Sequence, residues 1–163
     1  HGGSLRIFAK HSENKLFEIK ERVGNLIKKE KQMKLDDYSI YSDFSQKAKN
    51  VKTKLNQFLE KAQLEGKSTV CYGAPAKGNT LLNFCEIKTG QIKYTVDRSP
   101  HKQGLFLPGS HLPIKSPKTI LETKPDYIII LAWNLKDEIM EQMKDVRAWG
   151  CKFVVPIPEV KIL

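Results

Sequence analysis

The sequence predicts an α/β protein with a Rossmann-like, mostly parallel sheet that has helices on both faces. Strand-like and helical segments alternate from residue 67 onward, which is the order that a parallel sheet with crossover helices requires. One of these segments, 126–132, is a continuous apolar run, as expected for a parallel strand buried on both faces. A strand and two amphipathic helices are expected before the sheet.

The part before the sheet is predicted to be mainly helical. Residues 5–9 alternate enough for a strand, and residues 12–30 begin with a helix-start pattern followed by an apolar stripe. Apolar residues then recur at three and four residues over 44–62, which predicts a long helix that Gly66 ends. We expect both stripes to pack in the core of the chain itself rather than to form a groove for a partner.

Two regions follow from this pattern. We expect residues 1–66 to pack, as a strand and two helices, on an α/β core formed by residues 67–163, and the two to make one compact unit. The segments expected in the core are a strand at 69–72, a helix at 78–86, a strand at 92–96, a loop at 98–109, a short strand at 111–114, a short helix at 116–121, the buried strand at 126–132, a helix at 135–149 and a last strand at 152–156.

A glycine turn at 73–78 joins the first core strand to its helix, an arrangement that offers backbone N–H groups to an anion. Gly73 and Gly78 match the first and third positions of the dinucleotide fingerprint, but Pro75 occupies the second, where backbone should approach the pyrophosphate. Asn79 stands where a triphosphate-binding loop needs lysine. Lys77 opposes the helix dipole, a cost that an anionic ligand would offset, although a solvated loop lysine is the alternative.

Ligands of open parallel sheets bind beyond the carboxyl ends of the strands. The side chains expected there, besides the glycine turn, are Asp97, Arg98, His101, Lys102, Trp133 and Asn134. Asp97, about 20 residues beyond the turn, suits a ribose hydroxyl or a turn equally well. Arg98 and Lys102 could hold phosphate or lie in solvent. Trp133 could stack on a base or sugar, and Asn134 could bind ligand or cap the following helix. The histidine is a weak candidate.

No catalytic constellation is visible, since no Ser–His–Asp set and no acid pair with compelling spacing can be placed. The three cysteines lie far apart without metal-type spacing and are expected to be buried thiols. On chemistry alone, the chain is therefore predicted to be a binding domain for a phosphate-bearing small molecule that holds no metal.

The length of 163 residues and the composition fit a single domain with a hydrophobic core. The net charge of +10 raises nucleic-acid binding as an alternative, but the basic residues are spread along the chain and mixed with acids, so nucleic acid is an unlikely partner. With no transmembrane or signal-peptide pattern, we expect a cytoplasmic protein without a membrane partner. Because the first residue is His1, we expect a processed chain or a fragment.

Several long motifs, in the same order, resemble the C-terminal domain of SAM-dependent nucleotide-sugar C-methyltransferases. The resemblance covers nearly the whole chain and is weakest over 10–67. The segments that carry it are HGGSLR at 1–6, YGAPAKGNTLLN at 72–83, VDRSPHKQG at 96–104, LPGSHLPI at 107–114, AWNLKDEI at 132–139 and WGCKFVVPIP at 149–158.

The resemblance implies a deoxysugar-biosynthesis enzyme of three parts: a zinc-binding domain, a SAM-binding domain and this Rossmann-like domain. Such enzymes methylate a carbon of a nucleotide-linked keto-deoxysugar, and their proposed bases precede this domain, so the catalytic residues are expected upstream of His1. The chain itself is expected to bind neither SAM nor zinc, to pack with the missing domains and to help hold the nucleotide-sugar. The binding roles carry over to Lys77, Asn79, Asp97, Arg98, Lys102 and Trp133.

Two other functions stay open at this point. The glycine turn alone would suit a stand-alone module that binds a dinucleotide or coenzyme A, although Pro75 counts against it. Alternatively, the domain is purely structural and serves packing between domains. The sugar, the nucleobase, the methylated carbon and the oligomeric state do not follow from the sequence.

Overall fold

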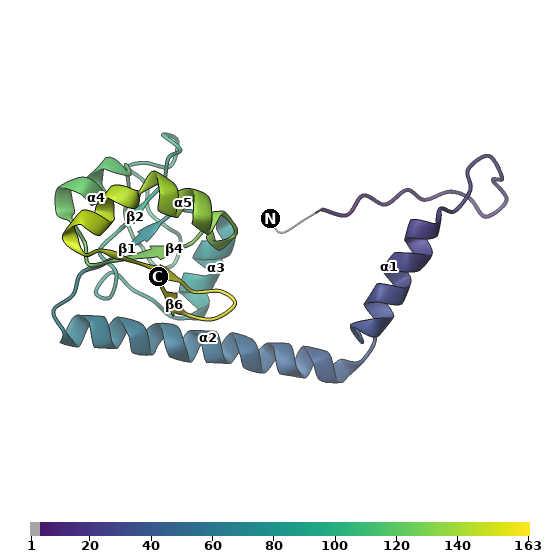
Figure 1. The fold of residues 1–163 in the computed structure, drawn as a ribbon, viewed down its shortest axis with the longest axis horizontal. Helices are drawn as coiled ribbons and strands as arrows, with labels where there is room; N and C mark the ends of the chain where they lie inside the picture. Colours follow the sequence, from purple (N-terminus) through teal and green to yellow (C-terminus); the bar gives the residue numbers. More distant parts are fainter. Residues whose placement is uncertain (1–3) are drawn as a thin grey trace. The chain divides into compact units, whose positions relative to one another are not determined.

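The computed structural model describes residues 4–163 of the chain (Figure 1). The first three residues, which open the family-like segment at 1–6, lie outside the described residues. The chain divides into two compact units, residues 1–48 and residues 49–163. The packing of 1–66 on 67–163 as one unit stays a prediction, and the two units are described separately below.

Residues 4–20 form neither helix nor strand, so the predicted strand at 5–9 is wrong. Alternation alone does not make a strand, because its backbone groups need a partner strand. The first helix, α1 (Glu21–Gln32), begins nine residues later than the helix-start pattern at Ser12. The Asn14 side chain accepts the Leu16 N–H at 2.9 Å, and such a local turn competes with helix formation.

The apolar stripe of α1 is exposed, and no residue of this helix is buried. Val23 and Ile27, at its centre, keep 45% and 48% of their surface accessible. The prediction that this stripe packs in the chain's own core is therefore wrong for α1. The residues between 4 and 20 add further exposed apolar side chains, among them Leu5, Ile7 and Phe8.

The long helix α2 (Tyr38–Leu64) follows the predicted stripe, and its second half packs in the core of residues 49–163. Its buried side chains are Val51, Leu55, Leu59 and Ala62. Gly66 ends the helix as predicted, with a φ of +67°, and the Lys67 N–H donates to the Ala62 carbonyl at 2.8 Å. This is the hydrogen bond of a Schellman motif, which favours glycine at the left-handed position.

The sheet has six strands in the order β3-β2-β1-β4-β5-β6, of which five are parallel. Their bounds are β1 (Thr69–Tyr72), β2 (Thr95–Val96), β3 (Ile114–Lys115), β4 (Tyr127–Ile130), β5 (Lys152–Val155) and β6 (Lys161–Ile162). The antiparallel edge strand β6 is an addition to the prediction. The α/β, mostly parallel Rossmann-like fold is confirmed, and the chain order reverses between β1 and β4.

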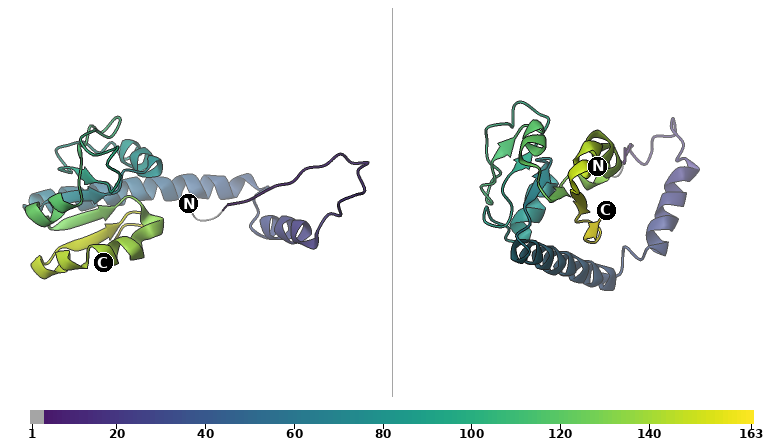
Figure 2. Two further views of the ribbon diagram at one scale, coloured as in Figure 1. Left: turned by 90° about the horizontal axis from the view of Figure 1, so that it is seen from above. Right: turned by 60° about the vertical axis from the view of Figure 1, so that its left-hand side comes forward.

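Helices cover both faces of this sheet (Figure 2). One face is covered by the second half of α2 and by α3 (Ala76–Phe84), and the other by α4 (Lys118–Thr123) and α5 (Lys136–Gln142), with short 3₁₀ turns η1 (Trp133–Leu135) and η2 (Lys144–Trp149). The single helix predicted at 135–149 is thus broken at Met143, where the backbone leaves the helical region. The tighter η2 turn buries Val146 completely and lets the Trp149 indole donate to the Pro125 carbonyl at 3.0 Å. Tertiary packing here overrides the helical pattern.

In the part of the chain that the structure describes, no helix is both long and apolar enough to cross a membrane.

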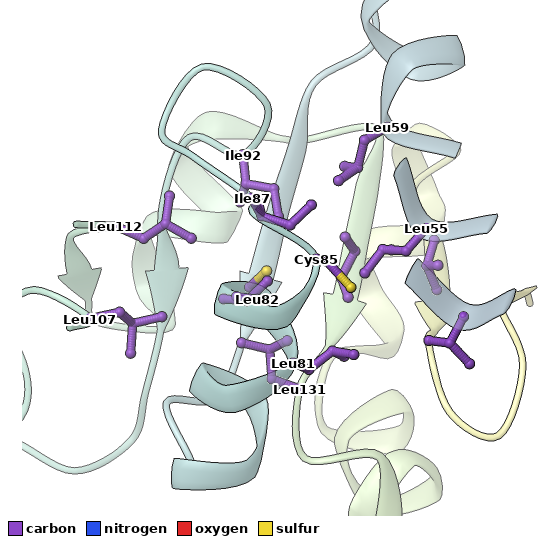
Figure 3. Packing of buried hydrophobic residues seen from close by; sticks show 14 of the residues in the cluster. Leu55, Leu59, Leu81, Leu82, Cys85, Ile87, Ile92, Leu107, Leu112 and Leu131 are labelled. Carbon is purple, nitrogen blue, oxygen red and sulfur yellow. The ribbon is translucent and has the colours of Figure 1, made fainter. Parts of the chain in front are cut away.

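Successive residues of the central strands enter two hydrophobic clusters, one on each face. Cys71 and Ile129 join the cluster covered by α2 and α3, which Figure 3 shows around Leu55, Leu59 and Leu131. Val70, Tyr72, Ile128, Ile130 and Phe153 join the cluster covered by α4 and α5. This burial on both faces explains the continuous apolar run of β4.

The three thiols are buried, as predicted, and none forms a disulfide. Burial raises the pKa of Cys85 to about 11 and that of Cys151 to about 12, and it raises the pKa of Cys71 further. Because the thiolate is the reactive species, we expect the folded chain at pH 8 to react with a disulfide reagent far more slowly than the unfolded chain. Absorbance of the released thiolate with and without denaturant measures this. Fast reaction of one thiol in the folded chain would place it at the surface.

Asp126 connects the starts of β1 and β4, since its carboxylate accepts the Ser68 N–H at 2.8 Å and the Lys67 ammonium at 2.9 Å. The pKa of Asp126 is lowered from 3.8, mainly by the hydrogen bond from the Ser68 backbone. A lowered folded-state pKa gives stability that is present above pH 3.8 and is lost as the pH falls through the folded-state pKa.

Asp126→Asn is therefore expected to lower the free energy of unfolding by about 1 kcal/mol at pH 7, since the side chain is partly exposed. The difference from wild type should shrink below about pH 4. Urea unfolding at several pH values measures this. The control is Asp137→Asn at a highly exposed carboxylate, and a difference that stays constant down to pH 2 would contradict the assignment.

Candidate functional site

The glycine turn, residues 73–78, lies at the carboxyl edge of β1, where the order of the sheet reverses. Gly73 adopts a φ of +95°, a region that side chains disfavour. Gly78 lies inside α3, which begins at Ala76 rather than at residue 78 as predicted. A Cβ on Gly78 would come within 2.7 Å of the Leu131 Cβ, so this glycine permits close approach of helix and strand. The turn therefore has the first and third glycine roles of the dinucleotide fold.

The Asp97 carboxylate binds one of the N–H groups of this turn from within the chain. Its carboxylate accepts the Ala74 N–H at 2.7 Å with one oxygen and the Ser99 N–H at 2.9 Å with the other. The Lys102 ammonium lies 3.4 Å from the same carboxylate and donates to the Ala74 carbonyl at 3.0 Å. These are the contacts of a turn residue, and the predicted contact of Asp97 with a ribose hydroxyl stays a prediction. Lys102, predicted to hold phosphate or lie in solvent, pairs with this carboxylate while 44% of its side chain is exposed, and its phosphate contact stays a prediction.

Lys77, Trp133 and Asn134 meet across the gap between the ends of β1 and β4. The Lys77 ammonium lies 4.5 Å from the centre of the Trp133 ring and donates to the Asn134 side-chain oxygen. Both partners are neutral, so the positive charge of Lys77 is not compensated by an acid in these contacts. The structure thus brings three predicted site residues together at the point where the sheet order reverses.

The remaining predicted residues lie apart from this group. Arg98 points to α5, where its guanidinium lies 3.7 Å from the Glu138 carboxylate, both mostly exposed. His101 is exposed in the turn after Pro100. Asn79 lies in α3 with its side-chain oxygen buried and without a hydrogen-bond partner among the described residues. A buried acceptor of this kind is rare and calls for a donor.

A hollow of about 400 Å³ opens beside the turn, on the face covered by α4 and α5. We call it the Arg98 hollow, and its main lining residues are Tyr72, Arg98, Gln103, Ser116, Lys118 and Met143. Only Arg98 among them was predicted as a site residue. Tyr72 and Ser116 could have been found from the sequence, because one ends β1 and the other directly follows β3. Gln103 and Lys118 carry no such signal.

The chemistry that this edge supports is binding by charge, stacking and hydrogen bonding. The Tyr72 hydroxyl donates to the Gln142 side-chain oxygen at 3.4 Å, and burial raises the pKa of Tyr72. Over residues 4–163, no three His, Cys, Asp or Glu side chains lie close enough together to hold a metal ion.

Comparison with known proteins identifies the family. Residues 1–158 match the family described as the C-methyltransferase C-terminal domain. The chain belongs to this family. The resemblance of the motifs at the glycine turn and at 96–104 is thereby confirmed at the level of the domain family.

This C-methyltransferase C-terminal domain is also similar to individual proteins. It is 32% identical over 163 residues to the C-methyltransferase NovU of Streptomyces niveus, and the match covers all of this chain and 39% of the relative. Among solved structures, the UDP-D-quinovosamine 4-dehydrogenase of Vibrio fischeri is 15% identical with a TM-score of 0.43, covering 60% of this chain and 93% of that chain. The chain thus spans about two fifths of the length of the curated relative.

Proposed function

We propose that this C-methyltransferase C-terminal domain binds a nucleotide-linked keto-deoxysugar at the carboxyl edge of its sheet and helps to shape the active site of a larger enzyme. The observation that carries the proposal is the Lys77 ammonium stacked on Trp133 with two neutral partners, beside the first turn of α3. A cation at that end of a helix is unfavourable unless an anion joins it. A sugar nucleotide supplies the anion and, in its sugar, a face for the tryptophan.

The methyl donor SAM, the zinc ion and the catalytic base belong, in this proposal, to other parts of the full-length protein, which would act in cytoplasmic deoxysugar biosynthesis. SAM supplies the methyl group that is transferred to carbon. Pro75 at the second glycine position of the fingerprint disfavours a dinucleotide on the glycine turn, and the Asp97 carboxylate already accepts the Ala74 N–H there. The described residues also offer no cluster of three potential metal ligands.

The partner proposed for the exposed apolar side chains of residues 4–48 is the remainder of the same protein. They include Leu16, Phe17, Ile19, Val23 and Ile27, each at least 45% exposed. Soluble proteins rarely expose many large apolar groups without a partner surface.

Two alternatives stay testable. A stand-alone dinucleotide or coenzyme A module is disfavoured by Pro75 and by the Asp97 carboxylate that already accepts the Ala74 N–H. A purely structural domain would leave Lys77, Trp133 and the orphaned Asn79 oxygen without a ligand. Binding experiments on the chain separate the three.

A thermal-shift panel is the direct test of the proposed function. We expect TDP-, UDP- or GDP-linked sugars near 100 times their dissociation constant to stabilise the chain by about 2.7 kcal/mol, which corresponds to a rise in melting temperature of about 5–11 °C. NAD, coenzyme A and SAM should give no shift. Lys77→Gln should at least halve the shift given by the nucleotide-sugar, because the uncompensated cation is lost.

The matched control is Lys93→Gln, which removes the same charge at an exposed position before β2, away from the carboxyl edge. A shift with NAD or coenzyme A would favour the stand-alone module. No shift with any nucleotide-sugar would favour the structural domain.

A further inference from the structure

The Lys77 side chain is held in one place by two neutral groups. Its ammonium lies 4.5 Å from the centre of the Trp133 ring and donates a hydrogen bond to the Asn134 side-chain oxygen. A lysine side chain in water samples many rotamers, and holding it in one of them costs entropy. The two contacts therefore fix the position of a charge that would otherwise move through the solvent.

Trp133 and Asn134 lie on a short turn that is itself well fixed. Trp133 begins η1 and packs against the hydrophobic clusters on both faces of the sheet. The Leu135 N–H closes the turn by donating to the Ala132 carbonyl at 2.8 Å. The backbone of Asn134 is thus held on both sides, although its side chain is exposed.

The Asn134 side chain has one task in the fold, which is to accept the hydrogen bond from Lys77. The predicted alternative, a helix cap, is not taken, because neither η1 nor α5 has a side-chain cap hydrogen bond. Over residues 4–163, the bond from Lys77 is also the one hydrogen bond that the Asn134 side chain makes. The contact with Lys77 is therefore the feature of Asn134 that calls for an explanation.

Acids at the same edge of the sheet are paired with other cations. The Asp97 carboxylate lies 3.4 Å from the Lys102 ammonium, and the Asp137 carboxylate, in the first turn of α5, lies 2.8 Å from the Lys136 ammonium. In the part of the chain that the structure describes, no ion pair joins Lys77 to an acid. The charge of Lys77 is thus fixed in position but not compensated.

We infer that Asn134 is a positioning residue that holds the Lys77 ammonium over Trp133 and, because its amide is neutral, leaves the positive charge to an anionic ligand. This inference rests on the proposed function and deepens it, because Asn134 acts through Lys77 rather than by touching the ligand. A carboxylate in the same place would bind the ammonium more strongly but would compensate its charge within the chain. The neutral amide therefore gives up some stability in favour of binding.

The test is isothermal titration of the 163-residue chain with TDP-, UDP- and GDP-glucose, together with the melting temperature of each variant. We expect Asn134→Asp to weaken binding about tenfold, because the charge of Lys77 is cancelled. Its melting temperature should stay at or above that of wild type, because a new ion pair forms. Damage to the fold would instead lower both the affinity and the melting temperature.

The matched control is Thr89→Asp, which adds the same charge in the exposed turn between α3 and β2, at the opposite edge of the sheet. It should change the affinity by less than about twofold, because a charge that is distant and exposed is screened by salt.

Asn134→Ala separates positioning from direct contact with the ligand. In the wild-type background it should weaken binding about threefold, because the ammonium must then be ordered when the ligand binds. In a Lys77→Gln background it should cause no further loss, because the group that it positions is already absent. A further loss of about threefold in that background would show that Asn134 contacts the ligand itself, and it would overturn the inference.

The indole N–H signals in a two-dimensional NMR spectrum test the contact without a ligand. Lys77→Gln and Asn134→Ala should both shift the signal of Trp133 and leave that of Trp149, whose indole donates to the Pro125 carbonyl, unchanged. If Asn134→Ala leaves the Trp133 signal unchanged, or if Asn134→Asp binds as tightly as wild type, the positioning role is wrong while the proposed function stands. If the wild-type chain binds none of the three conjugates, both fail.

Discussion

Replacing Gly78 by alanine is expected to lower the free energy of unfolding by about 3 kcal/mol, at the upper end of the usual range for overpacking. The new Cβ would lie 2.7 Å from the Leu131 Cβ, and it would also lie 3.2 Å from Pro75. Leu131 is completely buried, and Gly78 sits within α3, so neither atom can move without shifting a helix or a strand end. The strain therefore falls on the contact between α3 and the end of β4.

Chemical denaturation of the two proteins measures this effect. The matched control is Gly90→Ala, because a Cβ at Gly90 meets nothing within 4 Å, and it should change the free energy by less than about 0.5 kcal/mol. If Gly78→Ala were equally mild, α3 and the end of β4 would not be in close contact. Gly78 would then be explained by a ligand rather than by packing.

The sheet and its glycine turn could be predicted because burial dictates them. The apolar run around Tyr127–Ile130 is buried on both faces, and a continuous apolar run of this kind is typical of a buried strand rather than of a solvent-exposed element. The turn at Gly73 follows from the same logic, since a strand must end before a helix can return over the sheet. Local pattern and tertiary environment agree at these positions.

Other elements were not predictable because local and tertiary influences disagree. The helix-start pattern at Ser12 is overridden by the hydrogen bond between Asn14 and Leu16. The helical pattern of 135–149 is broken so that Val146 and Trp149 can reach their positions in the core. These outcomes depend on partners that are distant in sequence or on competing turns.

The candidate site shows the same division. Position at the strand ends was enough to name Lys77, Trp133 and Asn134, which do meet. It could not decide between two roles of Asp97, a contact with a ribose hydroxyl and hydrogen bonds within the turn. Both roles suit an aspartate that directly follows β2. That distinction depends on the rotamer of one carboxylate and can be tested directly.

Asp97→Asn is expected to lower the free energy of unfolding by about 3 kcal/mol. The amide oxygen can keep the Ser99 N–H, but the amide nitrogen then faces the Ala74 N–H and the Lys102 ammonium, which are both donors. A hydrogen bond to a charged group contributes about 1.5–3 kcal/mol, and the side chain is only 15% exposed, so water compensates little.

Urea unfolding of Asp97→Asn, Lys102→Met and the double variant measures the coupling of the pair. If the carboxylate fills the turn from within, the double variant should lose less than the sum of the single losses, because each single change leaves the other group unpaired. Asp137→Asn, at a carboxylate that is 80% exposed, should lose less than about 0.5 kcal/mol. A loss that small at Asp97 would mean that its carboxylate contributes nothing to the turn. The Ala74 N–H would then be free for a ligand of the glycine turn.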